Sequence, residues 1–397
     1  MNCRILLALA LAAPAAGQME MHHRMDAAGM YLMNLSSGTS ANPQSWRMPM
    51  VMMRTGSWDL MFMGQAFLVD TQQFGPRAGD KLYSANWFMG SAQHTLWGGT
   101  LMTTAMLSLE PATVTNRRYP LLFQTGETAY GRPLVDAQHP HDFVMELGFH
   151  YAHRVGEGTM LHVYYAPVGD PALGPVAFPH RASAAELPEA PLGHHWQDST
   201  HIASNVLTMA VKRSWFRFEA SGFYGTEPDE NRWNIDWGPM NSYSGRVSVA
   251  PAREWLFQVS AGRIARPERQ EPEDVTRTTA SAHYTRGGWS SSVVWGRSRS
   301  LDSYLAETVV PVRRRNFFTG RVEWVDKDEL SVPGTYGIAA YTGGYTRDVG
   351  ELRDFEAGIG ANLTAYAIPS AIRPYYGEHP WGVNVYLRFR LKPPATH

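Results

Sequence analysis

The sequence predicts an all-β fold: a transmembrane antiparallel up-and-down β-barrel of about sixteen to eighteen strands, with short periplasmic turns and long outer loops. Three observations support this prediction. Segments of roughly ten residues alternate in polarity with a period of two, as strands do. Short and long connections follow one another in turn. After the N-terminus no run of about eighteen consecutive apolar residues occurs, which disfavours a helical membrane protein.

The first seventeen residues have the layout of a secretory signal peptide. Arg4 precedes the apolar run ILLALALAA, and small residues from Pro14 to Gly17 follow it. We therefore expect residues 1–17 to direct export, and we expect Cys3, the single cysteine, to be removed with them. The exported chain would then have no cysteine for a disulfide, a zinc-thiolate site or a cysteine nucleophile.

The polarity alternation is clearest in the last segment, VNVYLRFRL from Val383. One face of this strand carries apolar side chains and the other carries Asn384, Tyr386, Arg388 and Arg390. A soluble β-sandwich rarely places arginines at successive positions of one face, whereas a membrane barrel has an apolar outer face and a polar lumen. Aromatic residues at strand ends fit the interfacial girdles of such a barrel: Trp58, Trp215, Trp255, Trp289 and Trp381.

Connection lengths give an independent indication. Short turns are expected near residues 54–57, 155–158, 212–214, 251–254, 286–288, 311–315 and 348–352. Long connections are expected near residues 36–45, 70–83, 111–140, 169–203, 226–242, 266–276 and 368–381. We place the first strand at residues 24–35. Residues 18–24 form a short Met/His-rich tail, and residues 25–397 form a single barrel with its longest loops at 111–140 and 169–203.

The charge balance excludes one class of partner. The chain has 35 Lys and Arg against 36 Asp and Glu, which gives no electrostatic case for binding nucleic acid. The expected partner of the outer face is outer-membrane lipid. Charges of both signs are expected inside the barrel, so the lining should have no sharp charge selectivity: Arg217, Glu219, Arg297, Arg299, Arg321, Glu323, Arg388 and Arg390. Four acidic residues of a long loop could attract cations to the mouth: Glu227, Asp229, Glu230 and Asp236.

Histidine is concentrated in two of the long loops. DAQHPHDF (136–143) and GHHWQDSTHI (193–202) end successive long connections, so both lie at the same rim. Imidazole and carboxylate groups suit zinc, copper or nickel, and the candidate ligands are His139, His141, Asp142, His194, His195, Asp198 and His201. The competing interpretation is that the loops fold inward and these side chains hydrogen-bond to one another and to the backbone.

Methionine is concentrated near the N-terminus, where eleven of the nineteen methionines fall between residues 19 and 63. Thioethers favour Cu(I), and the tail MEMHHRM offers a second candidate metal site formed by Met19, Met21, His22, His23 and Met25. Its alternative is a tail that binds nothing. For residues 48–63 we expect methionine to fill lipid-facing positions as an adaptable apolar side chain.

A catalytic site is the third interpretation of the second histidine-rich loop. Ser199, His201 and Asp198 are the residue types of a hydrolytic triad, and a membrane-embedded lipid hydrolase would use them. Neighbours in one extended segment point in opposite directions, however, and a G-x-S-x-G motif is lacking. We therefore do not expect an enzyme.

Several segments carry a resemblance. QTGETAYGRPLVDAQHPHDF, APVGDPALGPVAF, PLGHHWQDSTHI, GTEPDENRWNIDWGPMNSYSGR and YGEHPWGVNVYLRFRL are similar to a family of largely uncharacterised outer-membrane β-barrel proteins of Gram-negative bacteria. The similarity spans most of the exported chain and implies the fold without assigning a chemistry. The Met/His tract at the N-terminus resembles that of outer-membrane copper-resistance proteins in composition and position, which implies copper binding by the tail.

Together these features predict a porin-like channel in the bacterial outer membrane, with a polar lumen partly filled by the His-rich loops and with a link to copper or other transition-metal ions. The alternative is a resistance protein that binds metal without conducting. Copper and zinc are the candidate cofactors.

Overall fold

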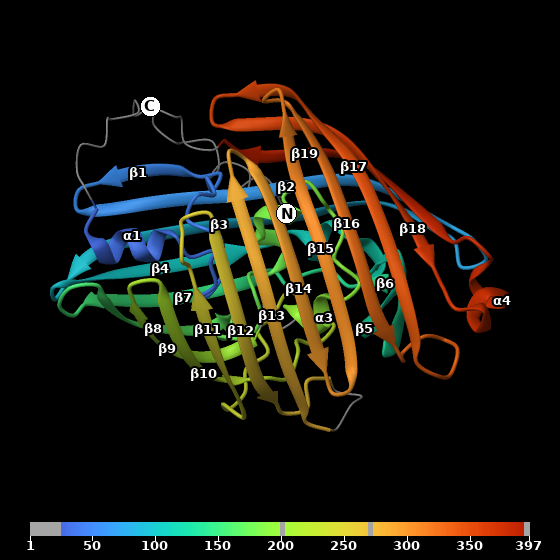
Figure 1. Ribbon diagram of the computed structural model, residues 1–397, viewed down its shortest axis with the longest axis horizontal. Coiled ribbons are helices and arrows are strands. Elements are labelled where there is room, and N and C mark those ends of the chain that lie inside the picture. The colour runs from blue at the N-terminus through green and yellow to red at the C-terminus, as the bar shows by residue number, and fades with distance from the viewer. Residues whose placement is uncertain (1–24, 199–202, 269–272, 393–397) are drawn as a thin grey trace, which may run out of the picture.

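The chain forms a closed barrel in a computed structural model that describes residues 25–198, 203–268 and 273–392 (Figure 1). Seventeen strands share one antiparallel sheet, and sixteen of them form the ring when the short strand β1 (Val51–Thr55) is set aside. The ring strands are β2 (Trp58–Phe74), β3 (Gly79–Leu96), β4 (Gly99–Leu107), β7 (Val144–Arg154), β8 (Thr159–Gly169), β9 (Ala203–Arg213), β10 (Phe216–Tyr224), β11 (Ser242–Val249), β12 (Trp255–Ile264), β13 (Val275–Arg286), β14 (Trp289–Ser298), β15 (Leu301–Val312), β16 (Asn316–Lys327), β17 (Tyr336–Leu352), β18 (Phe355–Ala367) and β19 (Trp381–Leu391). The predicted fold class is confirmed.

The ring closes between its first and last strands. β19 pairs with β2 from Phe74 to Gln65, and β1 pairs with β2 from Phe62 to Trp58. Because β3 occupies the other edge of β2, β1 and β19 lie end to end along the same edge. The seam of the barrel is therefore built from both ends of the chain.

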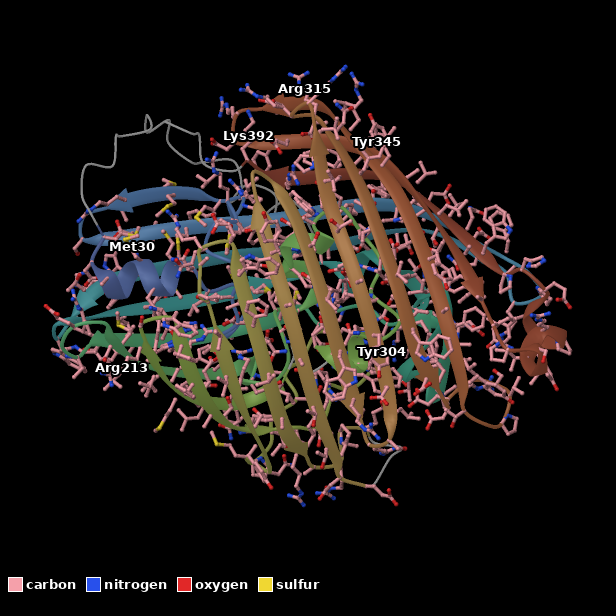
Figure 2. All side chains as sticks on the ribbon, viewed as in Figure 1. Met30, Arg213, Tyr304, Arg315, Tyr345 and Lys392 are labelled. Carbon is pink, nitrogen blue, oxygen red and sulfur yellow. The ribbon has the colours of Figure 1, made fainter. Side chains whose placement is uncertain are left out.

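The two faces of the wall have opposite character, as predicted. In β19, Val385, Leu387 and Phe389 are exposed, while the alternating Asn384, Arg388 and Arg390 are buried. The five tryptophans expected at strand ends are all exposed on the outside, as are Tyr304 and Tyr345 in Figure 2. An outward apolar surface with aromatic side chains suits a lipid environment. None of the helices among the described residues is long and apolar enough to cross a bilayer.

Short and long connections alternate between the two ends of the barrel. The short-turn end contains residues 97–98, 155–158, 214–215, 287–288 and 353–354, and the long-loop end contains 108–143, 170–198, 225–241, 265–268 and 368–380. One expected long connection, 70–83, is wrong: β2 and β3 run on to a turn at 75–78. Residues 36–45 are not a connection either, because they precede β1 and lie inside the barrel.

The expected first strand at residues 24–35 is also wrong, because this segment contains the helix α1 (Ala27–Met33). The Asp26 side chain caps the helix by accepting a hydrogen bond from the Gly29 backbone N–H at 2.6 Å. Ala28 and Leu32, four residues apart, form its buried face. This face packs inside the barrel in a cluster with Met61, Met102, Ala152 and Met160.

Three segments fill the lumen and together form what we call the plug. They are residues 25–50, the hairpin of β5 (Tyr119–Ala129) and β6 (Arg132–Gln138), and the loop 170–198. In that loop every residue except Pro179 and Ala185 is buried. Figure 1 shows the hairpin and α3 (His194–Gln197) within the outline of the ring. The remaining short helices are α2 (Glu110–Thr113), η1 (Thr115–Arg117), η2 (Phe178–His180), η3 (Ala182–Ala184), η5 (Ser370–Ile372) and α4 (Arg373–Tyr376).

Buried ion pairs hold the loop 170–198 to the wall. Arg181 Nε lies 2.7 Å from Glu307 Oε1 of β15. Glu186 pairs with Arg388 of β19 and, at 2.7 Å, with Arg390. A charge buried without a partner is costly, so each lumen charge predicted from the sequence needs such a partner. Arg297 and Arg299 were predicted to line the lumen, and this is wrong. Both are exposed and lie at the long-loop end, beside the turn that joins β14 to β15.

Most methionines of residues 48–63 do not face lipid as expected; the exception is Met53 of β1, which is exposed. Met61 and Met63 of β2 are buried in the lumen with relative exposures of 4% and 6%, whereas Phe62 between them is exposed. Met48 and Met50 pack against this interior surface from the plug. The expectation failed because the plug makes part of the lumen apolar, so an apolar side chain no longer identifies the lipid side.

Candidate metal centre

Three of the predicted ligands meet at the long-loop end of the plug. His139 follows β6, and His194 and His195 begin α3. One ring nitrogen from each lies within 4.8 Å of one from each of the others, and all three side chains are buried. We call this group the histidine cluster. It joins the hairpin loop to the loop 170–198, two segments separated by β7 and β8.

The surroundings of His139 determine which of its ring nitrogens is available to bind a metal ion. Its Nδ1 lies 3.0 Å from the Pro140 carbonyl oxygen, which can only accept, so Nδ1 carries the proton. Nε2 therefore presents its lone pair 3.2 Å from Glu127 Oε1, and among the described residues it finds no hydrogen-bond donor. Burial lowers the pKa of His139 to about 4. Two acceptors that face each other inside a protein leave a place suited to a cation.

His194 and His195 are positioned by the hairpin. His194 Nδ1 lies 3.0 Å from the Pro191 carbonyl oxygen and 3.0 Å from Gln124 Nε2 of β5, so it donates to the first or accepts from the second, depending on which ring nitrogen carries the proton. The His195 ring packs against Gly126, where a Cβ atom would come within 2.7 Å of His195 Cε1. Gly126 has φ +106°, a left-handed value that glycine adopts without cost. The glycine thus makes room for the third imidazole.

An acidic cavity adjoins the histidine cluster. His195 forms a second group with Glu227 and Glu268, again with ligand atoms within 4.8 Å of one another. Both carboxylates line a cavity of about 450 Å³ at the long-loop end, which Glu127 also lines. Its lining contains five carboxylates (Glu127, Glu227, Asp229, Glu230, Glu268) and two guanidinium groups (Arg117, Arg232). Glu227, Asp229 and Glu230 of the predicted acidic group line this cavity and Asp236 does not; their attraction of cations stays a prediction.

The other predicted loop ligands have different surroundings. His141 Nδ1 lies 3.0 Å from Glu110 Oε2; burial alone would lower the pKa of His141, but the Glu110 carboxylate outweighs burial and raises it. Asp142 lies 3.5 Å from Arg232. Asp198 accepts a hydrogen bond from the Phe178 backbone N–H at 2.7 Å. These three residues do not belong to the histidine cluster.

Several predicted residues lie outside the part of the chain that the structure describes. They are His201 and the tail residues Met19, Met21, His22 and His23, together with the signal peptide at 1–17 and Ser199 of the hydrolase alternative. Met25 is described: its sulfur lies 3.2 Å from Gln93 Nε2 on β3. The copper-binding tail therefore stays a prediction.

The sequence did not single out Glu127, Gly126 and Gln124. All three lie in QTGETAYG, a motif noted above only for its resemblance. Its signal was a glycine inside an otherwise regular segment, which marks a close approach of another chain segment. Glu268 also escaped notice, because it belongs to a charged, proline-rich stretch that has the composition of an exposed loop.

Proteins with a fold similar to that of this chain are found among the solved structures. A scan against protein-family models finds no match, and a search of the curated proteins finds none either. An anion-selective porin from Comamonas acidovorans superposes with a TM-score of 0.55 at 10% identity, over 84% of this chain and 100% of that one. The fold is that of the porins.

Two further structures agree. OmpF of Salmonella typhi, solved with daunomycin, gives a TM-score of 0.52 at 9% identity, over 86% of this chain and 100% of that one. A loop-deletion mutant of OmpT, an outer membrane protein of Vibrio cholerae, gives 0.51 at 10% identity, over 84% and 100%. At such low identity the likeness concerns the porin fold alone.

Proposed function

We propose that this protein is a bacterial outer-membrane barrel that handles transition-metal ions by binding a divalent ion at the histidine cluster, inside a porin-like lumen closed by the plug. The observation that carries the proposal is the convergence of His139, His194 and His195 from two separate loops into one buried group. Three imidazoles with an adjoining open space form a ligand set suited to Zn²⁺, Cu²⁺ or Ni²⁺.

The acidic cavity supports this proposal by supplying a route to the cluster. A cation that enters the cavity would reach His195 past Glu227 and Glu268, each of which has a carboxylate oxygen within 4.8 Å of a ring nitrogen of His195. Glu127 faces His139 Nε2, the nitrogen available to the ion, and is itself held by Arg232. On the other side of the ring the Pro140 carbonyl oxygen accepts from Nδ1 and orients the imidazole, as partners of metal-binding histidines commonly do.

The proposed location rests on three features. The N-terminal sequence has the layout of an export signal, the outer face of the barrel is apolar, and the fold matches outer-membrane porins. We therefore place the protein in the outer membrane of a Gram-negative bacterium, with lipid as the partner of its outer face.

A channel for small solutes is the second candidate function, and the porin-like fold favours it. Against free diffusion, the loop 170–198 is buried and tied to β15 and β19 by ion pairs. We therefore expect the purified barrel to conduct poorly until this loop moves. Single-channel recording in planar bilayers tests this, and a steady large conductance without metal would favour the solute channel.

The proposed metal site is tested by titrating the metal-free full chain in detergent with Zn²⁺, Cu²⁺ and Ni²⁺ by calorimetry. We expect saturable binding of at least one ion, lost when His139, His194 and His195 are all replaced by alanine. The matched control is His379→Ala, which removes an exposed histidine at the same end of the barrel. Binding that survives the triple replacement would refute the site.

A further inference from the structure

A row of methionines crosses the inner face of the barrel wall. Met63 of β2 pairs directly with Met89 of β3, and Met89 pairs with Met106 of β4. At the next strand a register shift between β4 and β7 brings Met145 into the same contact cluster. Directly opposed residues have Cβ atoms about 5 Å apart, so these thioethers form a continuous band, which we call the methionine row.

The methionine row contains a single residue type. Every buried member of its cluster is a methionine, and Met48 and Met50 of the plug cover it together with Trp87. The largest hydrophobic cluster also packs plug residues against the wall. It is built from Leu, Val, Ile, Ala and aromatic residues, with no methionine among its described members. Packing alone therefore does not require methionine between plug and wall. The distinguishing property of methionine here is its polarisable sulfur.

One end of the row opens into a small cavity of about 30 Å³. Met48, Met63, Trp87 and His180 line it together. The indole of Trp87 and the imidazole of His180 meet edge to face, with ring centroids 4.4 Å apart. Two thioethers, one imidazole and one indole therefore line the same cavity.

His180 is held in place by the plug. It ends η2, and its carbonyl oxygen accepts a hydrogen bond from Asn42 Nδ2 at 2.9 Å. The His180 side chain is buried, with a relative exposure of 6%, and imidazole is a suitable ligand for copper. Arg181 and Arg390 also line the cavity; Arg181 pairs with Glu307 and Asp198, and Arg390 pairs with Glu186 and Glu356.

We propose that this cavity is a binding site for a soft monovalent cation of the Cu(I) class, with Met48 and Met63 sulfur and a His180 nitrogen as ligands. Neutral soft donors suit Cu(I). They leave the ion its positive charge, which the face of Trp87 stabilises. The site differs from the histidine cluster in residues, in ligand type and in the ion it selects, and it does not depend on the proposed function.

The experiment titrates Ag(I), a redox-stable probe with the same ligand preference, into the full chain in detergent, and repeats the titration with Cu(I) under reducing conditions. We expect one saturable Ag(I) site whose affinity falls by about tenfold or more in the double variant Met48→Leu/Met63→Leu, since loss of a ligand should cost at least as much as loss of an outer-shell partner. The variant His180→Gln should weaken the same site. The matched control is Met209→Leu on the outer face, where Met209 is 62% exposed.

Other outcomes overturn the proposal. Unchanged Ag(I) affinity in the double variant would do so. So would a loss confined to a variant with Met19, Met21, His22 and His23 replaced, which would place the ion on the tail, or a loss confined to the triple histidine variant. If the double variant fails to fold by circular dichroism, X-ray absorption of Ag(I) bound to the unaltered chain decides: a first shell without sulfur refutes the site.

Discussion

The histidine cluster and the methionine row show two ways of placing ligand side chains inside one barrel. The cluster is built from loops, and its rings come together only because the hairpin and the loop 170–198 fold against each other. The row is built from strands, and the register of β2, β3 and β4 alone puts its residues side by side. A site made by loops can be dismantled by moving a loop, whereas a site on the wall persists as long as the barrel does.

The largest effect is expected from loosening the plug. Replacing Glu186 by alanine removes the carboxylate that Arg388 and Arg390 share and leaves them only Asp348 and Glu356, which should lower the free energy of unfolding by about 3 kcal/mol. The divalent ion should then bind more weakly, because His194 and His195 lie on the same loop. Urea unfolding followed by tryptophan fluorescence, with calorimetry, measures both effects.

The control for this prediction is Glu378→Ala. Glu378 pairs with Arg373 at 2.9 Å, but both side chains are exposed, so its loss should cost less than about 1 kcal/mol. Equal destabilisation by the two variants would show that the plug is not held by its buried charges.

The second prediction disturbs the histidine cluster alone. In Gly126→Ala the new methyl group would meet His195 Cε1 at 2.7 Å, so we expect divalent affinity to fall by about 10- to 100-fold while Ag(I) binding is unchanged. Gly131→Ala is the matched control, since Gly131 also has a left-handed φ, +71°, but nothing lies within 4 Å of its added Cβ. Similar losses in both variants would mean that backbone strain, rather than the ring, is responsible.

The third prediction concerns pH. Asp170, at the start of the loop 170–198, accepts a hydrogen bond from the Ser37 hydroxyl at 2.6 Å, and burial, with Glu146 nearby, raises its pKa well above 3.8. Because the folded state holds the proton more tightly, this group stabilises the fold at low pH, and the contribution is lost as pH rises above about 4 through the raised pKa. The slope is at most about 1.4 kcal/mol per pH unit.

Asp170→Asn should remove this contribution to the pH dependence, because the amide does not titrate. Stability measured from pH 4 to pH 8 should therefore fall less in the variant than in the parent chain. A variant curve parallel to that of the parent would contradict the assignment.

The smallest effect is expected within the wall. Met89→Leu nearly conserves volume in the methionine row and should change stability by about 1 kcal/mol or less. Divalent binding at the histidine cluster should not change. A large loss of stability by thermal melting would show that the row depends on the shape of methionine rather than on its sulfur.

Local patterns were enough to predict the wall. Alternation along each strand and the lengths of the turns depend on neighbouring residues, and β19 has the two faces that its sequence predicted. The helix α1 was missed because the cap at Asp26 outweighs a short apolar pattern that also fits a strand. The plug could not be predicted from local patterns, because its ion pairs join residues as far apart in the chain as Glu186 and Arg388.

The candidate site was predictable in part. Two histidine-rich loops at one rim are neighbours by topology, and His139, His194 and His195 do meet. The sequence does not show which of the seven predicted loop ligands meet, because this depends on their other partners. His141 pairs with Glu110, and Asp142 pairs with Arg232. Met61 and Met63 were assigned to the wrong face because hydropathy cannot distinguish lipid from a packed lumen.

The seam of the barrel has a consequence for assembly. Among the described strands β19 comes last in the chain, and the ring is complete only when it pairs with β2 beside β1. Residues 25–50 and the loop 170–198 both precede it in the chain. These plug segments therefore come before the strand that completes the ring. They can be in place when β19 pairs with β2, so that the ring closes around them.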